Sequence, residues 1–373
     1  MFHLQSRTPH LLPNPAVFAD RDTAHPMEQK MAKRLVLFNY PGDVCNTTSI
    51  YELGWLMAEK YRVLLVDADP SCNLTSLILR DGFDEYYASE NTSRQNLKDA
   101  TSTAFKLDGW PIKPIECPSV QHAPNLHLLP GHPNLAEWDL YLMLAQDADE
   151  KYGSLKSTPG AFNNLIASCE SKYNIDFTLI NLGPGIGGIN QNLFIHSDLF
   201  VVPTMPSPGS VKALEPLKYV TARWVRWKRE SIETLENAVY PLRPGTPKFG
   251  GMLIQRFSYR NGRTTSPHRQ NAADIKSVIS NDVFPHLLNH DMCFLPDQYP
   301  AAIRDDGYCL QEMEDFSALR NKAIEVGIPA FALSDAHAGE IGPLSKDEVR
   351  QRDHLRAQLD RINVGLISLF NHV

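Results

Sequence analysis

A short segment of this chain has the position that a phosphate-binding loop takes between a strand and a helix. It reads FNYPGDVCNTTS (residues 38–49), follows an apolar run and precedes an amphipathic pattern. Backbone N–H groups at the start of a helix bind anions, which is why phosphate loops occur there. The segment has no lysine, however, and Asp43 brings a carboxylate to the place where phosphates would bind. These residues leave three interpretations open: a nucleotide site, a site that has lost its nucleotide, or a coincidence of spacing.

Six apolar runs predict the strands that would hold this loop. They are rich in Val, Leu and Ile and span residues 34–39, 62–69, 126–131, 177–182, 199–204 and 249–257. Helical patterns separate them, and helices are predicted between the first two strands, at 155–172 and at 209–228. Ser345 followed by Glu348 is a capping-box pattern that starts a long C-terminal helix. This alternation predicts an α/β fold with a doubly wound, mostly parallel sheet between two helical layers.

Residues 31–373 are predicted to form a single domain. Residues 81–124 are polar and rich in turn formers, which predicts an insertion or a mobile loop within that domain. The first thirty residues mix proline, histidine and charge without a period, and they lack the apolar centre of a signal peptide. We interpret residues 1–30 as a disordered leader, or as residues upstream of a true start at Met31, since MAKRLVLFN continues directly into the first strand.

Composition and charge exclude several classes of protein. The 373 residues are 43% hydrophobic, and the net charge of −7 gives no whole-molecule attraction to nucleic acid. No apolar run approaches the ~20 residues that span a bilayer, so no membrane contact is predicted. The six cysteines are scattered without a C-x-x-C pair, which predicts reduced thiols in a cytoplasmic protein. Neither a metal-binding histidine spacing nor a G-x-S-x-G nucleophile elbow is present.

Four segments occur in an order that resembles the ParA/MinD family of P-loop ATPases. After the loop at 38–49 come LLVDADPSCNLT (64–75), LINLGPGIGGINQNL (179–193) and DLFVVPTMPSPGSVKAL (198–214). In that family the first loop reads N-x-K-G-G-V-x-K-T-T, the second strand ends D-x-D-P-Q-x-N-L-T, and the Walker B strand ends I-D-x-x-P. The resemblance covers roughly residues 31–370, and DADPSCNLT is its most specific part. It implies the three-layer fold of an AAA-type ParA domain.

The resemblance also assigns expected roles to individual residues. Mg·ATP is the ligand of the family, and a threonine hydroxyl and aspartates lie around the metal. By position, Thr47 and Asp67 would lie near Mg²⁺, and Asp69 would position the attacking water. The expected nucleotide-binding positions are Gly42, Val44, Asn46, Thr47, Thr48, Asp67 and Asn181.

This chain departs from the family pattern mainly at the charged positions. Pro41 occupies the place of the lysine that reaches across a nucleotide-sandwich dimer, and Asn46 occupies the place of the phosphate-binding lysine. Asn181 stands at the Walker B aspartate position. Asp43 and Cys45 occupy positions that the family fills with small residues, glycine above all.

Each of these departures weakens the binding of Mg·ATP. A charge-assisted contact to phosphate is worth about 1.5–3 kcal/mol, and both lysines are absent. The Asp43 carboxylate would repel a phosphate, and an amide at 181 binds Mg²⁺ less well than a carboxylate. Our hypothesis is a pseudo-ATPase with degenerate Walker motifs and no cofactor. The rival is weak binding of ATP and Mg²⁺ through Gly42, Thr47, Thr48 and the helix dipole.

Three further motifs have competing interpretations. GPGIGG (183–188) fits a dinucleotide-binding pattern, but the acidic residue Asp198 lies before the next strand and not at its end. The segment RWVRWKRE (223–230) suggests either DNA contact or a solvated helix face with Trp224 or Trp227 packed beneath, and we favour the second. The loop 255–270 is a candidate for contact with a partner or DNA, or a plain surface loop. The candidate cations are Arg223, Arg226, Lys228, Arg229, Arg260 and Arg263.

Two functions follow from these observations. The first is a non-catalytic regulatory or scaffold protein, of bacterial type, that binds a protein partner and dimerises through the old nucleotide face. The alternative is an ATP-dependent partition or positioning switch that dimerises on nucleotide and binds DNA nonspecifically, using Asp69 for water and Thr47 for Mg²⁺.

Overall fold

The computed structural model describes residues 31–39, 46–106, 111–147, 155–257, 259–260, 263–264, 266–337 and 342–373. The described part of the chain contains an eight-stranded sheet with the order β10-β7-β6-β1-β5-β2-β4-β3. Its neighbours pair in parallel, apart from the antiparallel pair β3–β4. The strands are β1 (Lys33–Leu37), β2 (Val63–Ala68), β3 (Ser119–Val120), β4 (Ala123–Leu129), β5 (Phe177–Leu182), β6 (Leu199–Thr204), β7 (Lys248–Phe257) and β10 (Cys309–Glu314).

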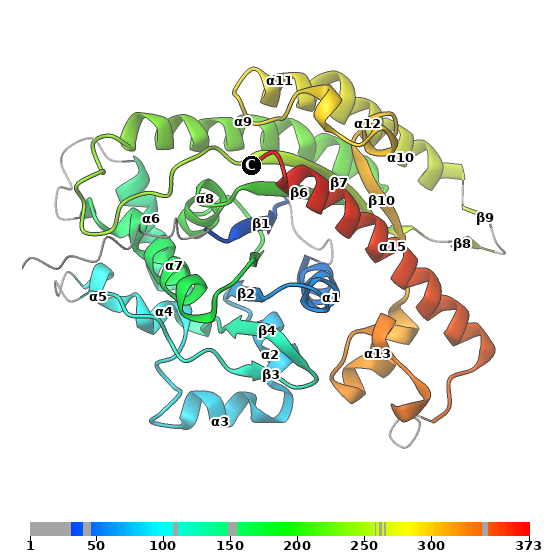
Figure 1. Ribbon diagram of the computed structural model, residues 1–373. Coiled ribbons are helices and arrows are strands. Elements are labelled where there is room, and N and C mark those ends of the chain that lie inside the picture. Colours follow the sequence, from blue (N-terminus) through cyan, green and yellow to red (C-terminus); the bar gives the residue numbers. More distant parts are fainter. Residues whose placement is uncertain are drawn as a thin grey trace, which may run out of the picture. The chain divides into compact units, whose positions relative to one another are not determined.

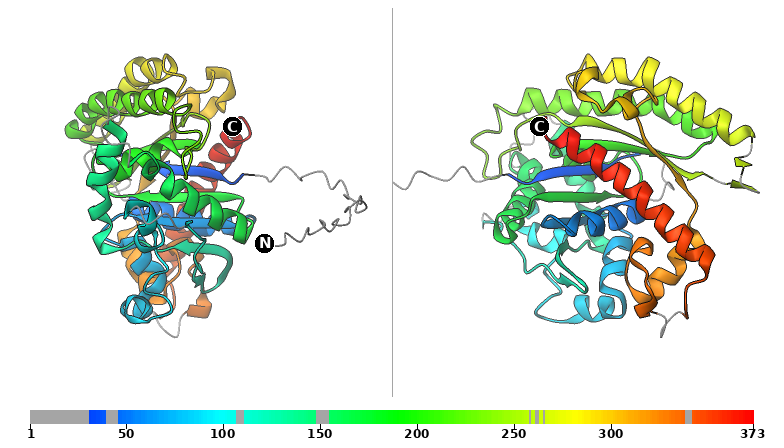
Figure 2. Two further views of the ribbon diagram at one scale, coloured as in Figure 1. Left: turned by 90° about the vertical axis from the view of Figure 1, so that its left-hand side faces the viewer. Right: turned by 45° about the vertical axis from the view of Figure 1, so that its right-hand side comes forward.

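Helices cover both faces of this sheet (Figures 1 and 2). On one face lie α8 (Gly188–Ile195), α9 (Pro208–Ser231) and α10 (Ser266–Val278), and on the other lie α1 (Asn46–Ala58) and α15 (Lys346–Phe370). The remaining helices are α2 (Asn73–Leu79), α3 (Phe83–Ala88), α4 (Leu97–Ala100), α5 (Ser102–Phe105), α6 (Glu137–Asp147), α7 (Ala161–Tyr173), α11 (Phe284–Leu288), α12 (Ala301–Arg304) and α13 (Ser317–Val326). The structure therefore has the α/β, doubly wound, mostly parallel architecture that the alternating pattern predicts.

The predicted strands match the structure within three residues at their ends, whereas the helix predicted at 155–172 begins six residues later, at Ala161. The six predicted strands correspond to β1, β2, β4, β5, β6 and β7. The capping box of α15 is confirmed, because Glu348 N donates to Ser345 Oγ at 3.2 Å and Ser345 N donates to Glu348 Oε2 at 2.8 Å. Strand β10, CLQEME, was missed because an edge strand is only partly buried and its sequence mixes apolar with polar residues.

The segment predicted as a polar insertion is in part built into the domain. It contains α3, α4 and α5, and Leu97 and Phe105 are buried in the main core. Phe105 stacks on Trp138 of α6 with ring centroids 4.5 Å apart. Polar turn formers dominate this segment, so its few apolar anchors give no periodic signal in the sequence.

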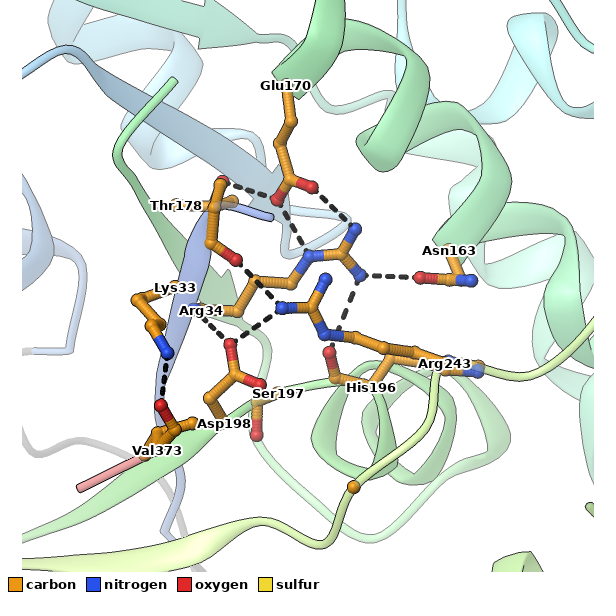
Figure 3. A network of polar contacts seen from close by, with 12 residues as sticks. Lys33, Arg34, Asn163, Glu170, Thr178, His196, Ser197, Asp198, Arg243 and Val373 are labelled. Carbon is orange, nitrogen blue, oxygen red and sulfur yellow. Dashed lines mark hydrogen bonds and ion pairs between the residues drawn. The ribbon is translucent and has the colours of Figure 1, made fainter. Parts of the chain in front are cut away.

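A buried network of charges closes the amino ends of the central strands (Figure 3). Arg34 of β1 is fully buried and donates to both carboxylate oxygens of Glu170 on α7, at 2.7 and 2.9 Å. Asp198, just before β6, accepts from Arg34 N at 2.7 Å and from Arg243 Nη2 at 2.8 Å. Burial alone would raise the pKa of Glu170, but the Arg34 guanidinium lowers that pKa below its ordinary value. The carboxylate is therefore ionised and paired.

No helix in the described residues has both the length and the apolar character needed to cross a membrane.

Candidate functional site

The carboxyl ends of β2 and β5 bring Asp67 and Asn181 directly opposite each other in the sheet register. Asn181 Nδ2 donates a hydrogen bond to Asp67 Oδ1 at 3.0 Å. On its other side, Asn181 Oδ1 accepts from Thr47 Oγ1, in the first turn of α1, at 3.4 Å. Two consecutive side-chain hydrogen bonds therefore connect Thr47, Asn181 and Asp67 across the place where the family pattern predicts magnesium.

Asp67 has both carboxylate oxygens engaged by groups of its own chain. Its Oδ2 accepts from Thr75 N at 2.9 Å and from Thr75 Oγ1 at 2.7 Å. Its Oδ1 accepts from Asn181 and, at 3.3 Å, from Asp69 N. Asp67 is fully buried, and this burial raises the pKa of its carboxyl even though the hydrogen bonds act in the opposite direction.

The end of β4 completes this polar cluster. Gly131 N donates to Thr75 Oγ1 at 3.0 Å, and Tyr87 OH donates to Gly131 O at 2.6 Å. A Cβ at position 131 would lie 2.9 Å from the backbone oxygen of Asp67, so only glycine fits here without a shift of the backbone. Sequence reasoning gave no role to Thr75, Gly131 or Tyr87. Thr75 had a usable signal, because it ends the DADPSCNLT motif.

Asp69 lies at the edge of this cluster and is partly exposed. Its Oδ1 accepts from Ser71 N at 2.9 Å. A Cβ built on Gly183, in the turn after β5, would lie 3.3 Å from the same oxygen. Asp69 therefore lies beside that turn, with room around it for solvent.

The predicted phosphate loop is described only where it enters the helix. Pro41, Gly42, Asp43, Val44 and Cys45 lie outside the described residues. Asn46, Thr47 and Thr48 form the first turn of α1, as predicted from their position. Asn46 Oδ1 is buried without a hydrogen-bond partner among the described residues. One turn further, Ser49 Oγ accepts from Gln255 Nε2 of β7 at 2.9 Å, which ties this helix to the sheet.

The structure agrees with one prediction for the basic segment at the end of α9 and disagrees with another. Arg223 and Arg226 are exposed, and Trp224 is buried beneath them, as the solvated-face interpretation predicts. Lys228 as a DNA-contact candidate was wrong, because the residue is 2% exposed. Its ammonium donates to the carbonyl oxygens of Ile195 at 2.5 Å and Gly245 at 2.7 Å.

The remaining cation candidates are held in different ways. Arg229 Nη2 donates to the carbonyl oxygen of His290 at 2.6 Å and lies 3.2 Å from an Asp291 carboxylate oxygen. Arg260 and Arg263 lie on the antiparallel pair β8 (Tyr259–Arg260) and β9 (Arg263–Thr264), and their side chains lie outside the described residues.

The geometry speaks against the dinucleotide interpretation of GPGIGG. Its glycines form the turn into α8, beside Asp69 at the carboxyl ends of the strands. Asp198 lies at the opposite end of the sheet, paired with Arg34 and Arg243. An acidic residue there cannot reach a ribose bound at the glycine turn.

A family model described as an AAA domain matches residues 32–233, which is more than half of the chain. The chain belongs to the ParA/MinD-type P-loop ATPase family. This ParA-like chain is 27% identical over 178 residues to an uncharacterized protein of Methanocaldococcus jannaschii, covering 48% of this chain. A second relative, from Rhizobium rhizogenes, is 23% identical over 260 residues, or 67% of this chain. The chain spans 60% and 56% of the lengths of these two relatives.

Solved structures agree with the fold. Apo McdA of Cyanothece has a TM-score of 0.55 at 17% identity, covering 90% of this chain and 99% of McdA. A McdA variant in complex with ATP has a TM-score of 0.56 at 16% identity, covering 90% of this chain and 96% of McdA. A protein of Corynebacterium diphtheriae has a TM-score of 0.54 at 22% identity, and the match covers 67% of this chain and 88% of the Corynebacterium chain. At these identities the likeness shows the fold alone.

Proposed function

We propose that this ParA-like chain keeps the P-loop fold but has lost tight Mg·ATP binding and hydrolysis, and that it acts as a regulatory or scaffold protein through a protein partner. The observation that carries this proposal is the pair of side-chain hydrogen bonds that connects Thr47, Asn181 and Asp67. The hydroxyl, the amide and the carboxylate that would surround a metal ion are hydrogen-bonded to one another instead.

The donor set explains why this arrangement disfavours magnesium. Mg²⁺ prefers anionic oxygen ligands in octahedral geometry, and a neutral amide at 181 removes one negative charge from the site. Asp67 already accepts hydrogen bonds on both oxygens, so a cation or its bound water would have to displace the chain's own donors. The raised pKa of Asp67 also weakens it as an anionic ligand.

The phosphate side of the site has lost positive charge. Asn46 stands at the family's phosphate-lysine position and Pro41 at its cross-dimer lysine position. Each missing ammonium–phosphate contact removes about 1.5–3 kcal/mol. Two such losses together weaken affinity by at least about two orders of magnitude, since 1.4 kcal/mol is tenfold in binding.

An exposed apolar surface on α6, which packs against the start of α8, supports the partner part of the proposal. Four neighbouring side chains of α6 are exposed, Leu140 by 62%, Tyr141 by 40%, Met143 by 49% and Leu144 by 37%. Helix α6 is fixed to α8, because Asp139 Oδ1 accepts from Ile189 N at 2.9 Å. Clustered exposed apolar side chains on a rigid helix are typical of a protein-binding surface.

Isothermal titration with Mg·ATP tests the nucleotide part directly. We expect no binding in the micromolar range by the natural chain, and the combined variant Pro41→Lys, Asn46→Lys and Asn181→Asp should gain it. A matched variant with Pro41→Gln, Asn46→Gln and Asn181→Asp keeps side chains of similar length at 41 and 46 without their positive charge, and it should stay inert. Micromolar binding by the natural chain, with dimerisation on ATP in gel filtration, would instead establish the ATP-dependent switch.

Photo-crosslinking tests the partner part independently of nucleotide. A photoreactive residue at position 140, on the apolar surface of α6, should give one predominant crosslinked protein in cells. The same residue in place of Val364, which is 70% exposed on α15, serves as the control and should not give that product. Equal products from both positions, or none from position 140, would contradict a partner that binds α6.

A further inference from the structure

Strand β10 lies at one edge of the sheet, close to α12 and α15 (Figures 1 and 2). Residues of these three elements line a groove of about 710 Å³, a volume within the range of about 300–1,000 Å³ that is typical of ligand sites. Strand β7 pairs with β10 on one side, and no strand in the described part of the chain pairs with it on the other. The outer edge of β10 therefore has backbone groups to which a further strand can bind.

Two side-chain amides bind backbone groups of β10 in place of a neighbouring strand. Glu314 N donates to Gln358 Oε1 of α15 at 3.4 Å, and Gln311 Nε2 donates to Glu312 O at 2.7 Å. Arg361 Nε holds the second amide by donating to Gln311 Oε1 at 2.8 Å. A side-chain amide has the same donor and acceptor groups as a peptide bond. A peptide backbone can therefore replace these amides without leaving the groups of β10 unpaired.

The base of the groove is apolar. Ile303 of α12 and Leu310 of β10 line it, and both are buried. A Cβ on Gly365 of α15 would lie 2.8 Å from Ile303 Cδ1 and 3.2 Å from Leu310 Cδ2, so the helix backbone closes against this base. Successive side chains of an extended peptide point to opposite faces. One set of alternate side chains would therefore meet apolar surface.

The groove also carries surplus negative charge. Four carboxylates line it and are 31–52% exposed: Asp306, Glu312, Glu314 and Asp360. Asp306 and Glu312 share the ammonium of Lys276, at 2.8 and 2.6 Å. Asp360 shares the guanidinium of Arg356 with Glu59. Among the described residues that line the groove, Arg361 is the one with a permanent positive charge. The groove therefore favours a basic ligand.

We propose that the outer edge of β10 binds an extended segment of a partner protein in which apolar and basic residues alternate. The backbone of this segment takes the place of the amides of Gln311 and Gln358 and adds a strand to the sheet. Its apolar side chains pack on the base of the groove, and its cations pair with the four carboxylates. None of the residues that line the groove belongs to α6, and binding here does not depend on nucleotide.

Fluorescence polarisation of a labelled peptide with the full chain tests the proposal. The probe is a heptapeptide of alternating lysine and valine, and we expect it to bind saturably at low salt. The same peptide with glutamate in place of lysine should not bind. Methylation of alternate backbone nitrogens keeps the charge and removes the donors, so it should weaken binding about tenfold. No binding by the lysine peptide, or equal binding by either altered peptide, would overturn the proposal.

Two alanines of α12 provide a matched pair of variants. Ala302 is exposed and lines the groove, so Ala302→Trp should fill the groove and abolish binding of the peptide. Ala301 is also exposed but does not line the groove, so Ala301→Trp should bind the peptide as the natural chain does. Unchanged melting temperatures would show that both variants fold. Full binding by Ala302→Trp would place the peptide elsewhere and overturn the proposal.

Charge variants and hydrogen exchange test the same site without filling it. Glu314→Gln and Asp360→Asn together should weaken binding about fivefold at low salt. Asp353→Asn, at an exposed position of α15 outside the groove, should leave binding unchanged. The bound peptide should slow exchange of the backbone amides of β10. Protection confined to other segments, or equal effects of the charge variants and Asp353→Asn, would contradict strand addition at this edge.

Discussion

The substitution Asn181→Asp restores the carboxylate that the family pattern has at this position, and it should strongly destabilise the chain when no metal is bound. Asn181 Nδ2 now donates to Asp67 Oδ1 at 3.0 Å. In the variant an acceptor replaces that donor, so two carboxylates face each other inside a buried site. The natural chain avoids this repulsion through its amide.

The size of the effect follows from the distance between the two groups. Two unit charges 3.0 Å apart repel by about 5 kcal/mol at an effective dielectric constant of about 20. Relaxation of the side chains and a retained proton reduce this value, so we expect a loss of about 3–5 kcal/mol in the free energy of unfolding near pH 8. Such a loss is a large share of the stability of an ordinary domain, about 5–15 kcal/mol.

The loss should depend on pH with a defined sign. Repulsion raises the folded-state pKa of the carboxylate pair, adding to the burial that already raises the pKa of Asp67. The folded variant then binds more protons than the unfolded chain, so its stability falls as pH rises above about 4, the unfolded value. Urea unfolding of the variant and the natural chain at pH 5 and pH 8 measures this difference.

Two comparisons decide whether the reasoning holds. Asn181→Leu removes the hydrogen bond without adding charge, and it should cost about 1–3 kcal/mol at pH 8. Mg²⁺ should restore stability to Asn181→Asp by neutralising the paired carboxylates, while leaving Asn181→Leu unchanged. If the two variants lose the same stability at both pH values, the carboxylates do not face each other and our account of the site is refuted.

Three further predictions concern the charges and caps outside the site. Arg34→Met leaves Glu170 buried without its partner and should lower the free energy of unfolding, measured in urea, by about 3–5 kcal/mol. The double variant Arg34→Met, Glu170→Met should lose less, because no unpaired charge stays buried. Burial lowers the pKa of Lys228 to about 7, so stability should rise between about pH 7 and pH 10, and Lys228→Met should remove that rise in thermal melts. Ser345→Ala breaks the capping box of α15 and should cost about 1 kcal/mol in urea unfolding.

A specific result would contradict each of these predictions. A double variant at 34 and 170 that loses as much as the sum of the single variants would mean that the two charges are not coupled. An unchanged pH dependence in Lys228→Met would place that lysine in solvent. A Ser345→Ala chain with full stability would show that the end of α15 adds nothing to the fold.

The sequence predicted most of the fold because each strand is a local apolar run and each helix has its own periodicity. Six of the eight described strands of the sheet followed from these patterns, as did the capping box at Ser345. The strands that were missed, β3 and β10, are short or partly polar and lie at the two edges of the sheet. Edge positions bury less apolar surface, so they leave a weaker pattern.

Residues whose role depends on distant partners could not be assigned from sequence. The sequence suggests a surface cation at Lys228, because it is one of four cations within residues 223–229, yet its ammonium is buried against Ile195 O and Gly245 O. No sequence pattern links Arg34 with Glu170, since 136 positions separate the two residues. Periodicity tells which face of an element is apolar, but it does not tell which atoms meet that face.

The sequence by itself determined the family pattern of this chain and the uncharged residues Pro41, Asn46 and Asn181. The tertiary structure decided which groups meet at the site: the register of β2 and β5 sets Asp67 opposite Asn181, and Thr47 reaches Asn181 from the first turn of α1. Residue types are local facts, whereas a hydrogen bond between residues 114 positions apart exists only once parallel strands have paired.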